Sequence, residues 1–541
     1  MTQDRPDTKR QYDIIVVGGG HNGLVCAAYL ARAGRDVLVL ERRDRAGGVL
    51  AAPELMPGVP APGPVVSAGR LSAKVAKDLW LDAQGVRLVK SDARLTSIAP
   101  DGRAITLWAD ADKTAAELRL SVRTDGAAYA RLDADLRGMA RFAARLAASA
   151  PPDVEKLRPS DLTNAMGLLR GYRSLGGRLA HDFLRVLPMP VADVVADYVE
   201  DDQLRAAIGW RGVRYTTLAP SDAGSAQVLL NDMVGGDGGL AGDMSICLGG
   251  PAVLAEALAK AAQARGAHIR LNAEVARVAV RDNRVTGVVL ADGEEIGARL
   301  VVSGLDPKRT LLGLLEPEVL GPTLGWEVAN LRQHGGTSAV LFALRDLPAF
   351  TGMSPGAAAT RLSGRVLMGE SINLLDRAAD AIKAGRLPER LVLEAAIPTL
   401  LDETLVQGNG VGHLMSVLVH GTPYALRGTS RDGDWDARRE ALGDQVVAQI
   451  EALAPGFGEL VVARRVLTPL DLERDYGLTG GHPLHGEPAL DQWFAWRPFL
   501  GAARYRLPVG GLFLCGSGAH PGGGVTGMPG YLAAREVLAA K

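Results

Sequence analysis

Tyr12-Asp-Ile-Ile-Val-Val-Gly18-Gly-Gly20-His-Asn-Gly23 determines the fold class that this chain is expected to adopt. The first half of the segment is a short apolar run rich in β-branched residues, which is typical of a parallel strand covered on both faces. The second half satisfies the pattern G-x-G-x-x-G, and residues 24–33 continue as an alanine-rich helical segment that ends at Gly34. Strand, glycine turn and helix therefore stand in the order of a dinucleotide-binding α/β unit.

Each glycine of this pattern has its own physical task. Gly18 permits the tight turn, Gly20 lets backbone amides approach a pyrophosphate, and Gly23 lets the helix pack closely on the strand. The N-terminus of the helix then holds the phosphate charge, so we assign His21 and Asn22 to the same site.

The second predicted strand, Asp36-Val-Leu-Val-Leu-Glu41, ends in a carboxylate. Glu41 stands roughly 20 residues after the glycines, which is the spacing expected for a residue that accepts a hydrogen bond from a ribose hydroxyl. A glycine turn kept only for strand–helix packing is the plainer alternative. The nucleotide site is favoured because the strand, the helix, the second strand and Glu41 follow one another at the expected spacing.

Length and composition limit the remaining possibilities. A chain of 541 residues with 47% apolar content exceeds what one core normally organises, so two associated domains are expected. The 60 lysines and arginines nearly cancel the 61 aspartates and glutamates, which argues against a nucleic-acid partner. Residues 1–11 are polar and are predicted to form a disordered tail without the apolar core of a secretory signal. We expect a cytoplasmic protein.

Cysteines and histidines point to no metal. Cys26, Cys247 and Cys515 are far apart in the sequence and form no C-x-x-C, which fits a reducing compartment and suggests neither a metal cluster nor a redox dithiol. His482 and His485 are close together, but no cysteine or carboxylate cluster nearby completes a metal site.

The C-terminus carries a second glycine loop. Residues 511–515 are a predicted buried strand, Gly516 to Gly527 a loop, and residues 531–540 a terminal helix. This loop also matches G-x-G-x-x-G, but the chain ends after one helix, so no following strand supplies an acidic ribose ligand. We therefore expect the loop to join the first site and present backbone amides to the cofactor. Its predicted contacts are Gly516, Ser517, Gly524, Val525, Thr526 and Gly527.

The middle of the chain returns to the same domain in this interpretation. Residues 251–262 form a predicted helix, residues 274–280 and 284–290 a hairpin around Asp282-Asn283, and residues 299–303 a third extended run before Gly304. An ordinary β-meander is the alternative for this segment.

Several of these motifs resemble known flavoproteins. Arg42 and the pair Gly47-Gly48 resemble the extended fingerprint of FAD enzymes of the glutathione-reductase type. In such enzymes the position of Val275 contacts adenine through its backbone. The segments GGGHNGL at 18–24, VVSGLDP at 301–307 and CGSGAHPGGGVTGMPG at 515–530 resemble the phytoene desaturase-like family. The resemblance implies FAD and a glutathione-reductase-type, Rossmann-like α/β domain built from separate segments, with an α+β substrate domain inserted.

The predicted boundaries follow from these motifs. Residues 12–95, 248–320 and 496–541 are expected to form the FAD-binding domain, and residues 96–247 and 321–495 the substrate domain. Gly304 is assigned to the FAD site.

Two residues are candidates for a catalytic role. His520 lies inside the C-terminal glycine loop, where it is predicted to polarise the flavin or to shuttle a proton. Holding the loop in place by a hydrogen bond is the alternative. Arg497 is predicted to hold an anionic group of the substrate, with Trp493 or Trp496 as an apolar wall, although core packing also explains the tryptophans.

The leading hypothesis is an FAD-dependent oxidoreductase that desaturates, saturates or isomerises C–C or C=C bonds of a hydrophobic, polyene or isoprenoid-like molecule. Hydride transfer at flavin N5 would serve all three. The alternatives are an amine oxidase-like flavoprotein and a flavoprotein that serves as an assembly partner. Arginines alternate with apolar residues over 168–187, which predicts either peripheral membrane contact or a domain helix with a solvated face. The oligomeric state stays open.

Overall fold

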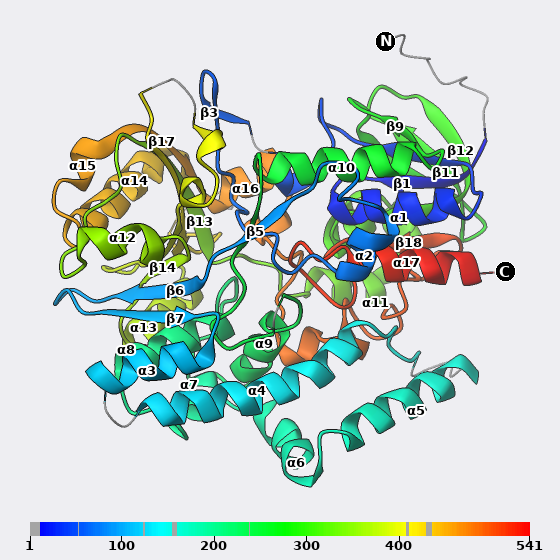
Figure 1. Cartoon of the computed structure of the whole chain (residues 1–541). Helices are drawn as coiled ribbons and strands as arrows, with labels where there is room; N and C mark the ends of the chain where they lie inside the picture. The colour runs from blue at the N-terminus through cyan, green and yellow to red at the C-terminus, as the bar shows by residue number, and fades with distance from the viewer. Residues whose placement is uncertain are drawn as a thin grey trace.

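The computed structural model describes residues 11–51, 53–122, 125–153, 159–236, 238–406, 410–428 and 435–540. Apart from Gln11, the tail predicted for residues 1–11 lies outside these ranges. The described chain contains two seven-stranded sheets, and the first and last elements of the chain lie together around one of them (Figure 1).

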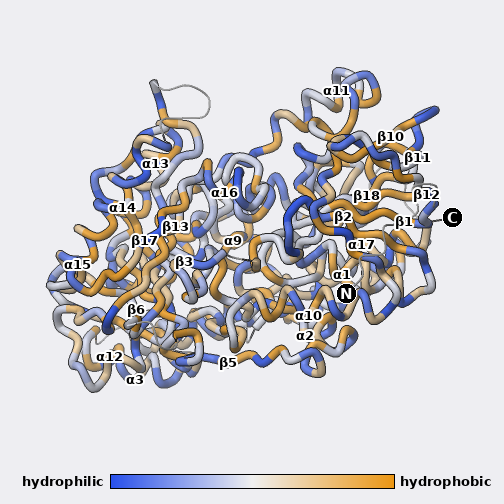
Figure 2. Tube along the Cα trace, turned by 90° about the horizontal axis from the view of Figure 1, so that it is seen from above, coloured by the Kyte–Doolittle hydropathy of each residue, from blue (hydrophilic) through white to orange (hydrophobic). Residues whose placement is uncertain are grey.

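The first sheet is built around β1 (Tyr12–Val17), as predicted. β1 pairs in parallel with β2 (Val37–Leu40) on one side and with β12 (Glu295–Ser303) on the other. β12 also pairs in parallel with β18 (Leu512–Leu514), so the two ends of the chain are one strand apart. Because both faces are covered, β2 and β18 are buried along their whole length, and their apolar runs stand out in Figure 2.

The predicted hairpin forms at the edge of this sheet. β10 (Val275–Arg281) and β11 (Arg284–Leu290) are antiparallel, and β11 pairs with β12. Asp282 and Asn283 both take positive φ, at 50° and 56°, a conformation that these two residue types tolerate in tight turns. On the opposite edge, β9 (His268–Arg270) pairs in parallel with β2.

Three helices cover one face of the first sheet. α1 (His21–Arg32) contacts both α10 (Pro251–Gln263) and the C-terminal α17 (Met528–Ala539). α1 begins three residues before the predicted residue 24, so His21 and Asn22 belong to its first turn. α17 also begins three residues before its predicted start.

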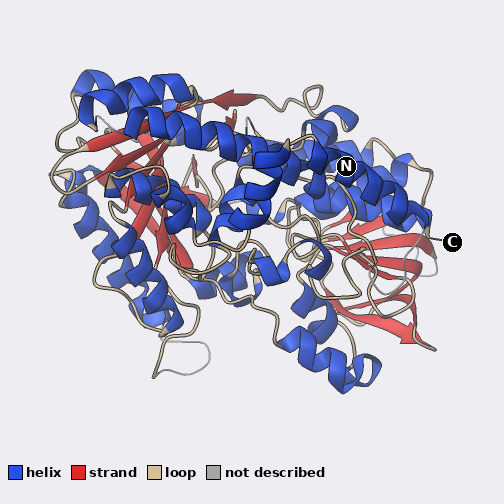
Figure 3. Ribbon diagram, turned by 90° about the horizontal axis from the view of Figure 1, so that it is seen from below, coloured by secondary structure: helices blue, strands red, loops and turns tan. Residues whose placement is uncertain are grey.

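The second sheet is mixed and belongs to the inserted part of the chain. The strands of the molecule form two separate groups in Figure 3. Its order is β17-β13-β16-β15-β14-β6-β7. The bounds are β6 (Ala93–Ile98), β7 (Ala104–Trp108), β13 (Thr337–Leu344), β14 (Arg365–Met368), β15 (Val392–Ala396), β16 (His413–His420) and β17 (Val461–Leu467). β6 starts three residues inside the segment predicted for the FAD-binding domain.

Helices from the inserted segments pack against the second sheet and fill the space beside it. They are α3 (Ala111–Ser121), α4 (Asp125–Ala147), α5 (Pro159–Arg173), α6 (Gly177–Val186), α7 (Val191–Ala196), α8 (Asp202–Gly209), α9 (Ser225–Asp232), α12 (Pro355–Leu362), α13 (Ile372–Lys383), α14 (Trp435–Glu451) and α16 (Pro469–Tyr476). The predicted fold class is therefore confirmed: a Rossmann-like α/β unit with a mixed α+β insertion.

Candidate functional site

A cavity of about 460 Å³ opens where the parallel strands of the first sheet end. The carboxyl ends of β1, β2 and β12 all point to it, which is where open α/β sheets bind their ligands. Its lining comes from each of the three segments that were predicted to share one site. Of the predicted cofactor contacts, Gly18, Gly20, His21, Asn22, Gly23, Glu41, Arg42, Gly48, Val275, Gly304 and Ser517 line this cavity, which we call the cofactor cavity.

The glycine turn has the close contacts that its sequence requires. Gly18 has φ +92°, and a Cβ on Gly23 would stand only 2.2 Å from the carbonyl oxygen of Gly18. A Cβ on Gly20, in contrast, would meet no protein atom within 4 Å. The fold itself therefore requires glycine at positions 18 and 23, whereas the space beside Gly20 is free for a ligand.

Glu41 lies at the end of β2, directly below this turn. Its Oε2 accepts a hydrogen bond of 2.8 Å from the amide of Gly19, and its Oε1 accepts one of 3.0 Å from the amide of Arg43. The carboxylate is buried and lines the cofactor cavity. Since each carboxylate oxygen accepts more than one hydrogen bond, Glu41 is still able to accept one from a ribose hydroxyl.

We expect Glu41→Ala to weaken FAD binding by roughly 10- to 100-fold, because a hydrogen bond to a charged group contributes about 1.5 to 3 kcal/mol. Glu41→Gln should lose less, since its side-chain oxygen can still accept from the Gly19 amide. Equilibrium titration of the apoprotein with FAD measures both variants. Equal affinity of wild type and Glu41→Ala would show that the ribose is held elsewhere.

The C-terminal loop packs directly on the N-terminal turn. Asn22 Nδ2 donates a hydrogen bond of 3.2 Å to Ser517 Oγ, across 495 residues of sequence. A Cβ on Gly516 would stand 2.5 Å from the carbonyl oxygen of Gly304, and one on Gly530 only 2.2 Å from that of Asn22. The two ends of the chain therefore meet at backbone-to-backbone distance.

Polar atoms in this cavity remain available for a cofactor. His21 Nε2 and Asn22 Oδ1 are buried and have no hydrogen-bond partner among the described residues. Burial, followed by the nearby His485, lowers the pKa of His21 to about 4, so its ring is neutral at neutral pH. Together with the free space at Gly20, these atoms fit a dinucleotide such as FAD.

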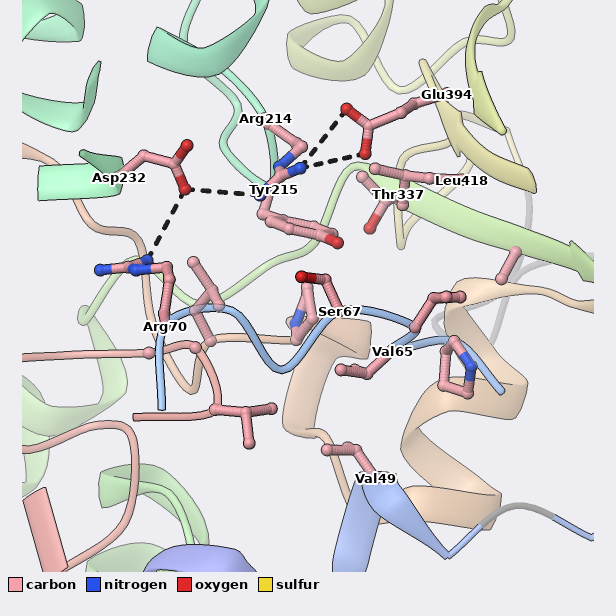
Figure 4. A pocket seen from close by; sticks show the side chains of 18 of the residues that line it. Val49, Val65, Ser67, Arg70, Arg214, Tyr215, Asp232, Thr337, Glu394 and Leu418 are labelled. Atoms are coloured by element: carbon pink, nitrogen blue, oxygen red, sulfur yellow. Dashed lines mark hydrogen bonds and ion pairs between the residues drawn. The ribbon is translucent and has the colours of Figure 1, made fainter. Parts of the chain in front are cut away.

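A second cavity of about 160 Å³ adjoins the first and is shown in Figure 4. The two cavities share five lining residues: His21, Val49, Leu478, Pro483 and Ser517. Gly524 and Val525 of the C-terminal loop line the second cavity only. We call it the substrate cavity, because a small molecule in it would lie against the cofactor at this shared, largely apolar wall.

The predicted contacts Gly47, Thr526 and Gly527 line neither cavity and pack against elements that form the site. Gly47 packs on α10, where a Cβ would stand 2.6 Å from the Cβ of Ala255. The carbonyl oxygen of Thr526 accepts a hydrogen bond of 3.1 Å from the amide of Ser72. Gly527 precedes α17 with φ +70°. The cofactor cavity also receives Arg309 and Tyr476, which no motif singled out, and His485, which was considered from the sequence only as a metal ligand.

His520 lines neither cavity. Its ring is buried, and its Nε2 lies 3.1 Å from the carbonyl oxygen of Leu146 at the end of α4. The placement favours the anchoring alternative over the catalytic prediction, since the side chain faces α4 and not the cofactor.

Burial lowers the pKa of His520 to about 3. We therefore expect the free energy of unfolding to decrease in acid. The unfolded chain takes up this proton near pH 6.5 and the folded chain does not, so stability is lost as the pH falls below 6.5. At about 1.4 kcal/mol per pKa unit, the free energy of unfolding should fall by roughly 3 kcal/mol between pH 6.5 and about pH 4 through His520. Urea unfolding across this range, compared with His520→Gln, measures it; identical pH profiles would contradict the assignment.

Arg497 is also turned away from both cavities. Its guanidinium donates to the carbonyl oxygens of Leu484 at 3.1 Å and Ser517 at 2.9 Å, among others. Arg497 thus connects the loop that contains Leu484 to the C-terminal loop that contains Ser517, and it does not face the substrate cavity. Trp493 lines neither cavity, and Trp496 is 55% exposed.

Six charged residues of the substrate cavity had no signal in the sequence. They stand on separate elements and meet only through the fold: Arg70, Arg211, Arg214, Asp232, Arg365 and Glu394. Figure 4 shows Arg214, Asp232 and Glu394 on the side of the cavity opposite Val49, and Arg70 below Asp232, with which it forms an ion pair.

The thiols of Cys26 and Cys515 lie next to each other, although they are remote in sequence. The Cys515 thiol and burial raise the pKa of Cys26 well above its usual value. A thiol held protonated is a poor nucleophile, and neither residue lines the cofactor or substrate cavity. We assign no redox role to this pair.

Within the described ranges, no group of three or more histidine, cysteine, aspartate or glutamate side chains is arranged to hold a metal ion. No helix in that part of the chain is long and apolar enough to span a membrane. In the segment 168–187, Arg178 pairs with Asp135 and Arg185 with Asp197. At least these two arginines therefore serve contacts within the protein.

Comparison with known proteins agrees with this geometry. Residues 16–68 match the NAD(P)-binding Rossmann-like domain, and residues 96–383 match the flavin containing amine oxidoreductase family. The chain is 34% identical to pyridine nucleotide-disulfide oxidoreductase domain-containing protein 2 of Rattus norvegicus, over 98% of this chain and 94% of the relative. It is 27% identical to a phytoene desaturase of Cereibacter sphaeroides, over 72% and 73% of the two chains.

Among solved structures, a putrescine oxidase superposes with a TM-score of 0.58 at 17% identity, covering 98% of this chain and 99% of that one. At this identity the likeness concerns the fold. It confirms the predicted architecture of a Rossmann-like domain with an inserted mixed sheet.

Proposed function

Because the chain belongs to the flavin containing amine oxidoreductase family and is related to pyridine nucleotide-disulfide oxidoreductase domain-containing protein 2, we propose that it uses FAD to act on a C–C or C=C bond of a largely apolar small molecule. The phytoene desaturase relative supports this bond class. The observation that carries the proposal is the wall shared by the cofactor and substrate cavities. Its side chains from Val49, Leu478 and Pro483 suit an apolar carbon skeleton.

Bound FAD would supply hydride chemistry at N5. In a desaturation, a hydride and a proton leave neighbouring carbons of the substrate, and in a saturation they are added. In an isomerisation they are first added and then removed again, so that the substrate undergoes no net oxidation or reduction. The chain's own contribution is to orient the reacting carbons and to exclude water. His21 is the titratable side chain that the described residues place on the shared wall, and its ring is neutral there.

Amine oxidation is the runner-up, because the family description names amines. An amine substrate is a cation in water. The substrate cavity offers more guanidinium groups than carboxylates, which disfavours a cation. The charge of the cavity therefore ranks the C–C or C=C bond above the C–N bond.

The test is anaerobic mixing of the oxidised, FAD-loaded protein with two donor panels, one of apolar alkenes and polyenes and one of primary and secondary amines. We expect the oxidised flavin absorption to be lost with a member of the first panel. Because saturation and isomerisation need reduced flavin, the photoreduced protein is mixed with the same polyenes, and products are analysed. Reduction by amines alone would contradict the proposal in favour of amine oxidation. No response in either direction, with one protein co-purifying, would favour an assembly role.

A further inference from the structure

The substrate cavity contains an excess of buried positive charge. Four guanidinium groups and two carboxylates are the charged groups that the described residues contribute to its lining. We refer to them as the arginine cluster: Arg70, Arg211, Arg214 and Arg365, with Asp232 and Glu394.

The two carboxylates are already fully engaged. Asp232 lies 2.8 Å from Arg211 and 3.4 Å from Arg214. Burial opposes its ionisation, but these guanidinium groups hold the pKa of Asp232 well below its usual range. Glu394 accepts hydrogen bonds from Arg214 at 3.0 Å and from the indole of Trp210 at 2.6 Å. Both carboxylates thus compensate chiefly Arg211 and Arg214.

Arg365 is the member with the fewest polar contacts, since Arg70, whose ion pair to Asp232 spans 3.7 Å, also donates hydrogen bonds to the carbonyl oxygens of Val234 and Asn231. Arg365 stands on β14 with a side chain that is 12% exposed, and its one ion pair within the described residues is a 3.5 Å contact from Nε to Oε1 of Glu394. Neither terminal nitrogen of Arg365 has a hydrogen bond in the part of the chain that the structure describes. Burial, and next Arg214, lower the pKa of Arg365.

A guanidinium does not release its proton in a protein, so Arg365 stays charged despite this cost. Burying such a charge is unfavourable unless it is paired and hydrogen-bonded. The planar guanidinium matches carboxylate and phosphate oxygens, with which it forms paired hydrogen bonds. An anion in the cavity would offset the excess charge.

The cofactor does not account for this charge. Arg365 lies on the second sheet and does not line the cofactor cavity. That cavity has guanidinium groups of its own for a pyrophosphate, on Arg42, Arg43 and Arg309.

Most of the remaining lining of the substrate cavity is apolar. Val65, Val66, Met244 and Leu418 contribute to it, besides Val49 on the shared wall. Figure 4 places Val49 and Val65 across the cavity from Arg214 and Glu394. A molecule that satisfies both surfaces has an apolar body and one acidic group.

We propose that the substrate is an amphipathic acid, whose carboxylate or phosphate is held by Arg365 of the arginine cluster while its apolar body extends to the shared wall. The proposal rests on the proposed function, because that function makes this cavity the substrate site.

The test uses four probes with one isoprenoid skeleton: geranate, geranyl phosphate, geraniol and geranylamine. Each is titrated into the FAD-loaded protein without turnover, and binding is measured from the change in flavin absorption and from the rise in melting temperature. We expect at least one of the two anions to bind at least tenfold more tightly than geraniol, and geranylamine to bind most weakly. Comparison of the two anions separates a carboxylate source from a phosphate source.

Arg365→Gln should remove the preference for the anion and leave FAD content and geraniol affinity unchanged. It should also raise the melting temperature of the ligand-free protein, because a poorly compensated buried charge is gone. The control is Arg464→Gln on β17 of the same sheet, where Arg464 pairs with the exposed carboxylates of Glu440 and Asp444. The control should keep the anion preference.

Equal binding of geraniol and both anions, binding of none of the probes, or an anion preference that survives Arg365→Gln would each overturn the proposal. A lower melting temperature of ligand-free Arg365→Gln than of the control would also count against it, since a structural arginine behaves in this way. An anion preference without reaction of any donor or polyene would refute the proposed reaction and leave this inference standing.

Discussion

Gly20→Val is expected to abolish FAD retention while the folded chain stays intact. Gly20 has φ −68° and ψ 167°, a backbone conformation that valine adopts without strain, and its Cβ would meet no protein atom within 4 Å. The new side chain would instead occupy the space where backbone amides must approach the pyrophosphate. Affinity should fall by at least about 100-fold, which corresponds to roughly 2.7 kcal/mol.

The measurement is FAD titration of the apoprotein together with its urea unfolding curve. Gly177→Val is the matched control, because a Cβ there also meets no atom within 4 Å and its φ is not positive. The control should bind FAD like the wild type. Wild-type affinity in Gly20→Val would mean that no pyrophosphate lies beside Gly20.

Gly530→Val is expected to destabilise the whole nucleotide-binding unit. Its Cβ would stand 2.2 Å from the carbonyl oxygen of Asn22 and 3.1 Å from the amide nitrogen of Cys26, both backbone atoms of α1. Overpacking a core typically costs about 1 to 3 kcal/mol, and a clash with backbone belongs at the upper end of that range. The free energy of unfolding should fall by about 3 kcal/mol, and FAD should be lost as α17 moves away from α1.

Gly356→Val provides the control, because Gly356 also follows a proline in the first turn of a helix, α12, where a Cβ meets no atom within 4 Å. Urea unfolding and flavin content should match the wild type in this variant. Equal destabilisation of the two variants would show that loss of glycine in a helix, and not the contact between α1 and α17, is responsible.

The nucleotide-binding unit was predictable because its determinants are local. The strand, the three glycines and Glu41 lie within 30 residues. Gly23 is required by its neighbour, since a Cβ there would stand 2.2 Å from the carbonyl oxygen of Gly18. The joining of the two chain ends was also predicted, from a second glycine loop between a buried strand and a helix. Pairing of β18 with β12 realises that expectation.

The direction of individual side chains was not predictable in the same way. The sequence places His520 in the glycine loop and Arg497 shortly before it, but backbone position alone does not decide which way a side chain points. His520 turns to Leu146 of α4, and Arg497 turns to the carbonyl oxygens of Leu484 and Ser517. Partners more than 300 residues away in sequence, such as Leu146, leave no local pattern.

The arginine cluster illustrates the same limit at the substrate cavity. Arg365 and Glu394 lie on adjacent strands of the second sheet, whereas Arg70 and Arg214 come from irregular segments before α2 (Ala73–Asp78) and after α8. In the sequence they are four of the 121 charged lysine, arginine, aspartate and glutamate residues. Only the packing of the inserted segments against the first sheet brings them to one cavity.

Identification of the cofactor is the most direct test of the central claim, that both ends of the chain build one FAD site. The purified protein is denatured, and the released chromophore is separated and quantified against FAD and FMN. We expect FAD in a ratio of about one per chain, because the pyrophosphate turn and Glu41 recognise parts that FMN lacks. A protein that releases FMN, or that stays colourless and binds no added FAD, would contradict it.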